Sequence, residues 1–440
     1  AVIGSGPAGY TAAVRLSQKG VKTLLFEGES MGGTCTNTGC IPTKALYHCA
    51  SIMRQNSSGR RVGVEAGESK LDYGKALRHA KKAVKLSGMG VEKLLKEAGV
   101  DVVSKHAVFQ PNQAITAGGE TFTPKKTLVA AGSQPKAIPS LKPDKKFIYD
   151  TDGFLKNESL PEKLAIVGGG FIGVEHAFIY SAFGCKVTLI EALPQILGFE
   201  DPDVREFVTK ALSNECTLKT STKVVDCRAS DGCVSLDDGT ELLVDRVLSC
   251  AGRKPATEKL GLESARVKVD EAGFIITDDY LKTTADGVYA AGDAVGGYML
   301  AHEASMQAET AAENMAGGKK SFKKQAIPWV VFSKPPVMHC GLTEEEAGDA
   351  CVTGTADYAA NGKAITANQR HGFVKSIIHA STKKVLGLHG VGQDCDSLCG
   401  EASVIVGEGM TAMQAADCIH AHPTYPELIR ESLLDALKKS

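Results

Sequence analysis

The chain has 440 residues, of which 43% are hydrophobic and 23% charged, and its formal net charge is −1. That length exceeds what one hydrophobic core organises and suggests about three domains. The near-neutral charge gives no electrostatic case for binding nucleic acid or an anionic membrane, and no apolar run approaches the roughly 20 residues that span a bilayer.

The thirteen cysteines are an odd number and are scattered along the chain, which favours a reducing compartment. We therefore expect the cytoplasm, or the mitochondrial matrix if the source is eukaryotic. Cys395 and Cys399 lie one helical turn apart and could form a second redox or metal pair. Because no histidine or further cysteine follows at ligand spacing, no metal site is expected.

Residues 1–27 predict the first half of a nucleotide-binding fold. A short strand leads into the turn Gly4-Ser5-Gly6-Pro7-Ala8-Gly9, followed by a helix over Tyr10–Lys19 and a strand over Lys22–Glu27. In such a turn the first glycine allows the tight bend and the second lets backbone N–H groups approach a pyrophosphate. The third allows the helix to pack closely on the strand. Few residues precede Gly4, so we expect the first strand to be incomplete at its start.

Two cysteines then occur five residues apart in Gly32-Gly33-Thr34-Cys35-Thr36-Asn37-Thr38-Gly39-Cys40. A regular helix would place their Cα atoms about 8.6 Å apart, whereas a disulfide needs roughly 4.4–6.8 Å. If the two cysteines bond, the segment must leave helical geometry, and its three glycines supply that freedom. On spacing alone, two ordinary buried cysteines in a loop remain an equally good interpretation.

The next elements are a helix through Ala45–Met53, a long amphipathic helix over Tyr73–Ala98 and a parallel strand over Lys126–Ala131 that ends at Gly132. These patterns continue the first α/β fold.

A second nucleotide-binding fold begins with the strand Ala165–Val167 and the turn Gly168-Gly169-Gly170-Phe171-Ile172-Gly173. The helix Val174–Phe183 and the strand Val187–Ile190 follow. Each turn has an acid 23 residues after its first glycine, Glu27 and Glu191, and this repetition predicts two dinucleotide sites. A carboxylate binds an unsubstituted ribose and repels a 2′-phosphate, so Glu191 favours NAD over NADP.

From Ile327 onward the pattern predicts an α+β domain. The expected antiparallel strands are Val330–Phe332, Gly362–Ala367, Phe373–His379 and Val385–Val391, and the expected helices are Ser397–Glu408 and Met413–Cys418.

Near its C-terminus the chain contains the motif His420-Ala421-His422-Pro423-Thr424-Tyr425-Pro426-Glu427. A thiol with a pKa near 8.5 needs a base that titrates near neutrality, and histidine is that base. A carboxylate on the other ring nitrogen would fix its tautomer. Thr424 to Glu427 also fits a helix capping box, and for His420 packing or a hydrogen bond is favoured over catalysis.

Together these motifs resemble those of the pyridine nucleotide–disulfide oxidoreductases, from Ala1 to about Leu437, and within them the members that oxidise dihydrolipoamide. The resemblance implies an α/β fold with two Rossmann-like dinucleotide-binding domains, the second inserted in the first, and a C-terminal α+β dimerisation domain. The implied ranges are 1–153 and 283–326 for FAD, 154–282 for NAD and 327–440 for dimerisation.

The resemblance also implies the roles of individual residues. Cys35 and Cys40 form the redox disulfide, and His422 is the acid/base, with Glu427 orienting it and a cis bond before Pro423. Lys44 and Glu175 pair near the flavin, although they could instead be two surface charges. The remaining implied cofactor-binding residues are Gly4, Gly6, Gly9, Glu27, Gly33, Thr34, Gly132, Gly168, Gly170, Gly173, Glu191, Gly252, Asp293, Leu300 and Ala301.

The implied activity is oxidation of protein-bound dihydrolipoamide to lipoamide with NAD⁺, through the disulfide and FAD. The implied partners are a second copy, whose disulfide His422 would serve, and the lipoylated carrier of a 2-oxo acid dehydrogenase or glycine cleavage system. The alternatives are a glutathione- or mercuric-reductase-like enzyme and a flavin-binding scaffold without turnover. Two departures, Ala130-Ala131-Gly132 and Gly252-Arg253-Lys254-Pro255-Ala256, could loosen packing where the domains meet.

Overall fold

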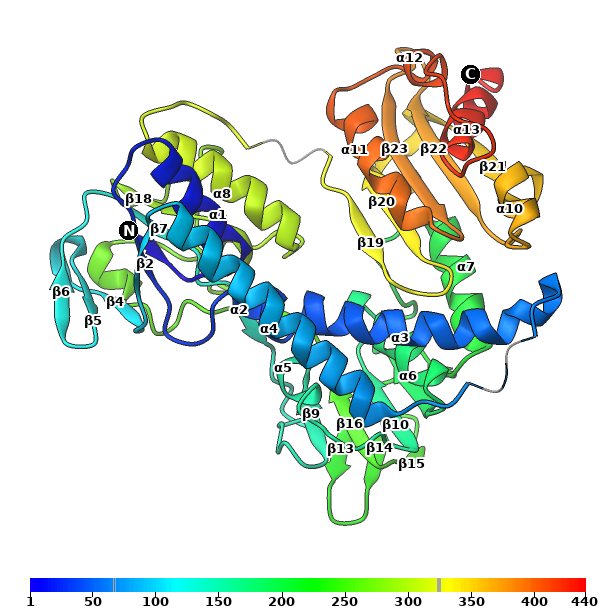
Figure 1. Ribbon diagram of the computed structural model, residues 1–440, viewed down its shortest axis with the longest axis horizontal. Helices are drawn as coiled ribbons and strands as arrows, with labels where there is room; N and C mark the ends of the chain where they lie inside the picture. The colour runs from blue at the N-terminus through cyan, green and yellow to red at the C-terminus, as the bar shows by residue number, and fades with distance from the viewer. Residues whose placement is uncertain (66, 68, 323–325) are drawn as a thin grey trace.

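The computed structural model describes residues 1–65, 67, 69–322 and 326–440. Three five-stranded sheets form its frame, and helices cover them (Figure 1). Two of the sheets are parallel and carry the glycine turns, whereas the third is antiparallel and lies in the C-terminal part. This arrangement confirms the predicted fold class.

The first sheet has the order β18-β7-β1-β2-β3, with every neighbouring pair parallel. Its strands are β1 (Val2–Ile3), β2 (Leu24–Phe26), β3 (Asp101–Val103), β7 (Thr127–Val129) and β18 (Val288–Ala290), and its helices are α1 (Pro7–Gln18), α4 (Tyr73–Glu97) and α8 (Ala301–Met315). Because β18 pairs with β7 across more than 150 residues, the chain does return to the first sheet, as predicted.

The second sheet has the order β12-β11-β10-β16-β9 and is also parallel. It contains β9 (Ile148–Asp150), β10 (Lys163–Val167), β11 (Lys186–Ile190), β12 (Thr217–Lys219) and β16 (Arg246–Ser249), with α5 (Thr151–Phe154), α6 (Phe171–Ala182) and α7 (Pro202–Ser213). Strand β9 thus pairs in the second sheet although it precedes the boundary expected after residue 153.

Smaller sheets extend and join these two. The antiparallel pair β8 (Ser133–Pro135) and β17 (Arg253–Pro255) connects the two nucleotide-binding parts. The others are a sheet of β4 (Ala107–Phe109), β5 (Ile115–Ala117) and β6 (Glu120–Phe122), and one of β13 (Val224–Arg228), β14 (Cys233–Leu236) and β15 (Glu241–Leu243).

The third sheet has the order β19-β20-β23-β22-β21 and is antiparallel. Its strands are β19 (Trp329–Val331), β20 (Val337–Gly341), β21 (Cys351–Asp357), β22 (Phe373–His379) and β23 (Val385–Val391), and its helices are α9 (Glu344–Ala347), α10 (Gly362–Thr366), α11 (Cys399–Gly407), α12 (Ala412–Ala416) and α13 (Glu427–Lys438). Strands β22 and β23 have the predicted bounds.

The strand predicted over 362–367 is wrong, because this segment is the helix α10. The Asn361 side chain accepts a hydrogen bond from the Ala364 N–H and caps the helix, which a reading of polar–apolar alternation does not register. Strands β20 and β21 were not predicted.

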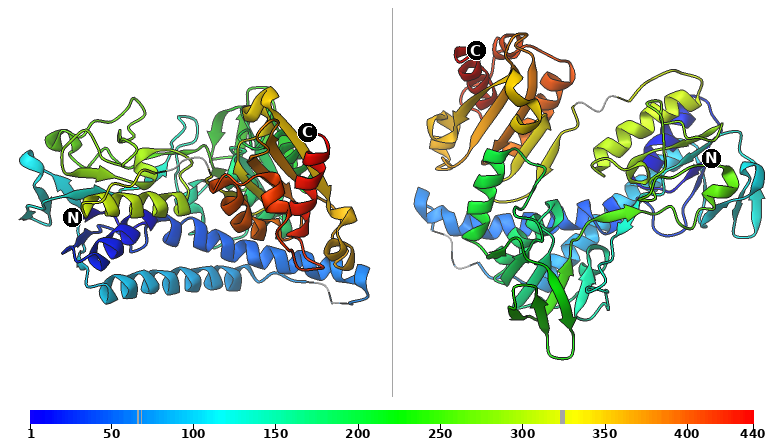
Figure 2. Two further views of the ribbon diagram at one scale, coloured as in Figure 1. Left: turned by 90° about the horizontal axis from the view of Figure 1, so that it is seen from above. Right: turned by 180° about the vertical axis from the view of Figure 1, so that it is seen from behind.

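One long helix, α3 (Cys40–Ser58), carries the redox segment at its beginning and packs against α4 and α6. It therefore connects the first sheet to the second (Figures 1 and 2). It begins five residues before the predicted start. Within the described residues, no helix combines the length and the apolar character that crossing a bilayer requires.

Candidate active site

The segment between the two cysteines leaves helical geometry, as predicted for a pair five residues apart. Helix α2 (Gly33–Asn37) carries Cys35 and ends at Thr38, and after Gly39 the chain begins α3 with Cys40 as its first residue. Gly32 and Gly33 have φ values of 91° and 61°, a region that side chains disfavour, so glycine is required at this entry.

The two sulfur atoms differ in their electrostatics. Both cysteines are thiols in the structure, so the disulfide itself stays a prediction. The hydrogen bond between them raises the pKa of Cys35, which burial raises further, and lowers the pKa of Cys40 to about 7. Lys44 favours the Cys40 thiolate as well, and so does the N-terminus of α3. Of the two sulfur atoms, Cys40 is therefore the one at which the thiolate is favoured.

The predicted pair of Lys44 and Glu175 is confirmed beside this segment. The Lys44 Nζ lies 2.8 and 3.0 Å from the two carboxylate oxygens of Glu175, whose side chain is only 5% exposed. The Phe332 backbone N–H donates to the same carboxylate at 3.1 Å, and the Lys44 ammonium lies 4.6 Å from the centre of the Phe332 ring. Desolvation of Glu175 is thus offset by two donors from distant parts of the chain.

The first glycine turn has the geometry that a pyrophosphate requires. A Cβ atom at Gly4 would lie 2.3 Å from the Ala130 carbonyl oxygen, and one at Gly9 would lie 1.8 Å from the Gly4 carbonyl oxygen. At Gly6 a Cβ would meet no atom within 4 Å, which leaves open space at the beginning of α1. Backbone N–H groups at a helix N-terminus bind phosphate in such a space.

Glu27 lies at the end of β2 and folds over this turn. Its Oε2 accepts hydrogen bonds from the Ser5 N–H at 2.9 Å and the Ser5 hydroxyl at 2.5 Å. The carboxylate is therefore held beside the turn, where a cofactor ribose would lie.

The second glycine turn repeats this construction. A Cβ at Gly168 would lie 2.4 Å from the Cys250 carbonyl oxygen, one at Gly173 would lie 1.8 Å from the Gly168 oxygen, and one at Gly170 would meet nothing within 4 Å. Glu191 accepts the Gly169 N–H at 2.5 Å. Both turns therefore fit a dinucleotide pyrophosphate. Glu27 and Glu191 lie where each would bind the ribose of such a cofactor.

A hydrogen-bond cluster joins the first sheet to the second. Asp293, in the turn after β18, accepts from the Ser133 hydroxyl at 2.5 Å. Arg253 donates to that hydroxyl at 2.7 Å and to the Ser133 carbonyl at 2.9 Å, and it reaches Thr34 of the redox segment at 3.5 Å. The departures at Ala130–Gly132 and Gly252–Ala256 therefore leave this junction firmly bonded.

The remaining predicted flavin residues lie at the ends of elements. Gly132 follows β7 and Gly252 precedes β17, both with positive φ and with no atom within 4 Å of an added Cβ. Leu300 caps α8, which begins at Ala301, without a side-chain hydrogen bond. The N-terminus of a helix carries a partial positive charge that would favour an anionic group such as the N1/O2 edge of a reduced flavin.

His422 is oriented by Glu427. Its Nδ1 lies 2.8 Å from Glu427 Oε1, while Oε2 of the same carboxylate accepts the Thr424 N–H at 2.7 Å. Both interpretations of Glu427 therefore hold, one on each oxygen, although the Thr424 hydroxyl donates to the Ala421 carbonyl and leaves the capping box half formed. The Thr424 N–H and His422 together lower the pKa of Glu427.

This contact settles the proton positions on His422. Because an ionised carboxylate only accepts, Nδ1 carries the hydrogen and Nε2 of the neutral ring presents its lone pair. The His422 side chain is 75% exposed, and the bond to Pro423 is cis, as predicted. In Figure 1 the helix α13, which follows His422, lies well away from α2, which carries Cys35.

The other singled-out side chains have structural partners. His420 bonds to the Glu401 carboxylate at 2.8 Å and the Cys418 carbonyl at 2.9 Å, as expected for a hydrogen-bonded residue. Burial raises the pKa of Cys395, and it raises the pKa of Cys399 to about 12, so neither thiol is poised for redox chemistry. The sequence missed the roles of Ser5 and Ser133, whose only signal was their place next to a motif glycine.

Comparison with known proteins agrees with this geometry. The profile of the pyridine nucleotide-disulphide oxidoreductases matches residues 1–308, and the profile of their dimerisation domain matches residues 327–433. The chain therefore belongs to the pyridine nucleotide-disulphide oxidoreductases, a family of flavoprotein disulfide oxidoreductases that use FAD and NAD.

Within this family, the chain is 37% identical to the dihydrolipoyl dehydrogenase of Chlorobaculum parvum, over all of this chain and 97% of the relative. It is 33% identical to that of Geobacillus stearothermophilus, over 99% and 95%. Among solved structures, LpdA from Mycobacterium tuberculosis superposes with a TM-score of 0.93 at 25% identity, covering 98% of each chain. The HOCl-induced flavoprotein disulfide reductase RclA from Escherichia coli superposes with a TM-score of 0.88 at 29% identity, also covering 98% of each.

Proposed function

We propose that this protein oxidises protein-bound dihydrolipoamide to lipoamide with NAD⁺ as the electron acceptor, as the name of its curated relatives indicates for them. The observation that carries the proposal is the polarised thiol pair. Cys40, at the start of α3, has its pKa lowered to about 7 by the hydrogen bond from Cys35, next to the ion pair of Lys44 and Glu175. A low-pKa sulfur paired with a high-pKa sulfur is suited to thiol–disulfide exchange.

The chain's own residues account for the exchange. Nε2 of His422 takes the proton of one substrate thiol, and the resulting thiolate attacks Cys35 of the disulfide form. The Cys35–Cys40 bond breaks, and Cys40 leaves as the thiolate. The second substrate thiol then attacks the substrate sulfur of the mixed disulfide, which closes the lipoamide ring and releases Cys35, with the second proton on Cys35. FAD at the first turn would accept this electron pair and pass it to NAD⁺ as hydride.

One carboxylate, that of Glu191, would set the choice of cofactor at the second turn. Glu191 is held by the Gly169 N–H at 2.5 Å and the Leu193 N–H at 2.8 Å, so that its carboxylate has a fixed position. There it would bind the hydroxyls of an unsubstituted ribose and repel a 2′-phosphate, which supports NAD over NADP.

We further propose a homodimer in which His422 serves the Cys35–Cys40 pair of the partner. Large apolar side chains are exposed on the C-terminal part and are available for an interface: Ile365, Val404, Met413 and Ile419. A two-fold interface is self-complementary, so each chain lends its base and receives one. The separation of α13 from α2 within one chain (Figure 1) supports this arrangement.

Mixing subunits tests the shared site. A Cys40→Ser subunit combined with a His422→Gln subunit is expected to regenerate one intact site per heterodimer, although both parents are inactive. Two variants that share one defect, Cys40→Ser with Cys35→Ser, are the matched control and should stay inactive. Stable heterodimers without activity above either parent would place the base in cis.

The domain ranges 1–153 and 283–326 for FAD, 154–282 for NAD and 327–440 for dimerisation remain our proposal, with the pairing of β9 arguing that the second range begins before residue 148. Residues 323–325, at the end of the third range, lie outside the described residues.

We also propose a lipoylated carrier protein as the substrate-bearing partner. All thirteen cysteines are described as free thiols, which fits a reducing compartment such as the cytoplasm or the mitochondrial matrix.

The deciding experiment is formation of NADH by the flavin-loaded protein with dihydrolipoamide or with a lipoylated carrier domain. We expect turnover with both, and a loss of at least about 10²-fold in His422→Gln because general base catalysis contributes that much. Glutathione disulfide, with NADH or NADPH as the reductant, serves as the comparison substrate. Turnover of glutathione disulfide but not of dihydrolipoamide would place the protein in another branch of the family, and a flavin-loaded protein inactive with both would leave a scaffold.

A further inference from the structure

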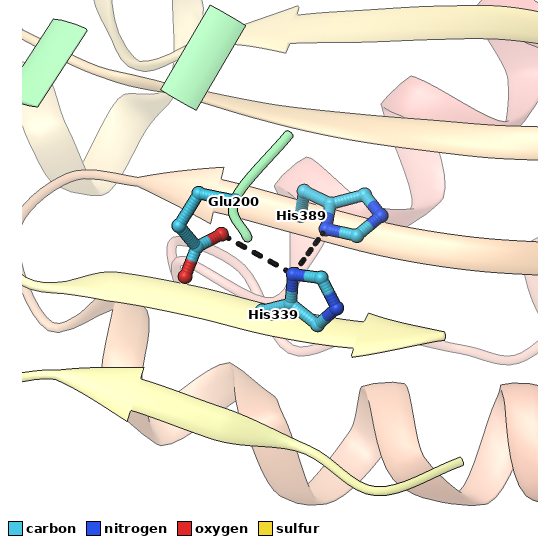
Figure 3. Close-up of side chains that lie close together, drawn as sticks. All are labelled: Glu200, His339 and His389. Atoms are coloured by element: carbon cyan, nitrogen blue, oxygen red, sulfur yellow. Dashed lines mark hydrogen bonds and ion pairs between the residues drawn. The ribbon is translucent and has the colours of Figure 1, made fainter. Parts of the chain in front are cut away.

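Three buried side chains from distant parts of the chain converge between the second and third sheets (Figure 3). Glu200 lies just before α7, and His339 and His389 are register partners on β20 and β23. The His339 Nδ1 lies 3.2 Å from the Glu200 Oε2 and 3.1 Å from the His389 Nδ1. One ligand atom from each of the three side chains lies within 4.8 Å of the other two, and the side chains of Glu200 and His339 are at most 1% exposed.

The outer nitrogen of each imidazole has a fixed role. The His339 Nε2 lies 3.0 Å from the Gly341 carbonyl oxygen, and the His389 Nε2 lies 2.8 Å from the Leu342 carbonyl oxygen. A carbonyl oxygen only accepts, so both Nε2 atoms carry hydrogen, and in neutral rings both Nδ1 atoms present lone pairs. Histidines that bind metals typically have this arrangement, with the second N–H held by a backbone carbonyl.

Three lone pairs then face one another away from water. Two Nδ1 atoms at 3.1 Å and a carboxylate oxygen at 3.2 Å repel unless a positive charge lies among them. One proton on Glu200 would satisfy the contact to His339 but would leave the two Nδ1 atoms facing each other. An extra proton on a ring would make a buried imidazolium, which desolvation disfavours. A metal ion would satisfy all three atoms at once.

The spacing also suits such an ion. Zinc bonds of about 2.0–2.1 Å in a tetrahedral site separate ligand atoms by about 3.3 Å, and two of the three separations here are 3.1 and 3.2 Å. We propose that Glu200, His339 and His389 form a binding site for a divalent transition-metal ion of the zinc class, a site of two imidazoles and one carboxylate that the sequence did not predict. Imidazole ligands suit zinc, copper, nickel and iron, rather than calcium or magnesium.

Neighbouring residues hold these ligands in place. The Trp329 indole N–H donates to Glu200 Oε1 at 2.5 Å, and its ring stacks on His339 with centroids 3.3 Å apart. Next to Glu200, Asp201 is bonded to the buried Lys375 of β22, which also contacts Asp203 and Glu344. Trp329 thus binds the Oε1 atom of Glu200 and leaves Oε2 to face the two histidines. The nearby acidic side chains are already paired with Lys375.

The bound ion would act as a clip between two parts of the molecule. Glu200 belongs to the segment that follows β11 of the second sheet, and both histidines belong to the third sheet. None of the three ligands is among the residues to which we assign chemistry. Metal binding is therefore expected to stabilise the attachment of the C-terminal part, by binding the folded state only, without supplying a catalytic group.

The test measures zinc binding by the flavin-loaded protein with its active-site cysteines oxidised, after removal of metal with a chelator. Equilibrium dialysis should show one more tightly bound zinc per chain in the parent protein than in His339→Gln or His389→Gln, in which affinity for that equivalent falls by at least about a hundredfold. The matched control is His379→Gln, a histidine on β22 outside the cluster, which should retain the equivalent. Zinc should also raise the melting temperature of the parent and of the control but not of the two cluster variants.

A second measurement needs no variant and so does not depend on their folding. X-ray absorption at the zinc edge of the parent protein should show a first shell of nitrogen and oxygen with imidazole rings. Zinc uptake that is equal in the parent and the cluster variants would overturn the proposal, and so would a shell dominated by sulfur. Either result would assign the convergence of the three side chains to a shared proton.

Discussion

The two glycine turns have nearly the same framework but different surroundings. In each turn, a Cβ added at the first or third glycine would clash with a backbone oxygen, whereas one added at the second would meet no atom within 4 Å. In each, the carboxylate of an acid 23 residues after the first glycine accepts a hydrogen bond from a backbone N–H of the turn. The redox segment packs on the first turn, because a Cβ at Gly33 would lie 2.8 Å from the Gly6 Cα and the Ser5 hydroxyl accepts the Gly32 N–H at 3.0 Å. The redox segment is thus attached to the first turn, whereas the second turn contacts Leu197, whose N–H donates to the Gly169 carbonyl oxygen at 2.9 Å.

We infer from this difference that the two turns have different roles. We expect a cofactor at the first turn to lie next to the segment that bears Cys35 and Cys40, because this segment is bonded to that turn. We expect a ligand of the second turn to exchange more readily, because the redox segment is bonded to the first turn.

The largest effects should come from alanine at the third glycines. In Gly9→Ala and Gly173→Ala the new Cβ would lie 1.8 Å from a carbonyl oxygen, a clash that backbone atoms relieve only by moving. We expect each to destabilise its own sheet by about 4 kcal/mol or more. Gly9→Ala should lose the flavin, whereas Gly173→Ala should keep it and lose NAD-dependent turnover. Absorption spectra and calorimetry measure both.

Gly6→Ala and Gly170→Ala are the matched controls. Neither Cβ would meet a protein atom within 4 Å, so both variants should fold with a loss of cofactor affinity only. Equal loss of flavin from Gly9→Ala and Gly173→Ala would show that the two folds do not act independently.

The next prediction concerns the segment that only the first turn has. Cys40→Ser should keep the flavin and abolish the long-wavelength thiolate–flavin absorption of the two-electron-reduced protein. In the parent this band should grow as the pH rises through about 7, because the pKa of Cys40 is lowered to about 7 and the thiolate exists above it. Cys35→Ala removes the hydrogen bond that lowers this pKa, so the midpoint should move to higher pH. A band that persists in Cys40→Ser would contradict the assignment of the sulfur atoms.

Cofactor choice should distinguish the two acids. We expect the parent to prefer NAD over NADP by at least about tenfold, or roughly 1.4 kcal/mol. Glu191→Gln should reduce this preference because it removes the charge that repels a 2′-phosphate, whereas Glu27→Gln should weaken the flavin without altering the ratio. Steady-state kinetics with both nucleotides provide the test, and equal efficiency of the parent with both would refute the role of Glu191.

The smallest effect should follow from Ser5→Ala, which makes the first turn more like the second. The hydroxyl donates to Glu27 and accepts from the Gly32 N–H, so its loss should cost about 1 kcal/mol in the free energy of unfolding. Urea denaturation of the flavin-free protein measures this cost, with the exposed Ser30→Ala as control. A change no larger than in that control would mean that the redox segment is held without this hydroxyl.

The features that the sequence predicted are those with a local signal of fixed spacing. The turns, the cysteine pair, and His422 with Glu427 lie within short motifs whose chemistry limits their geometry. The features that it missed depend on contacts across the chain. Strand β20 has a run of buried residues on both sides and no alternation, and Ser133 meets Arg253 across 120 residues.

The buried cluster shows the same limit most clearly. Glu200 and His339 are 139 residues apart, and nothing near either residue suggests a shared site. Only the pairing of β20 with β23, and the packing of the segment before α7 against them, brings the three side chains together. Sheet register between distant strands is set by the packed fold and cannot be read from one strand alone.

The carboxylate of Glu175 has a consequence for how the protein is made. Its partners Lys44 and Phe332 are 131 and 157 residues away on either side, so the carboxylate is not fully bonded until Phe332 has left the ribosome. Domains generally fold in order from the N-terminus during synthesis. The two glycine turns can therefore form on the growing chain well before the Lys44–Glu175 pair beside the cysteines gains its last hydrogen bond, which comes only with Phe332.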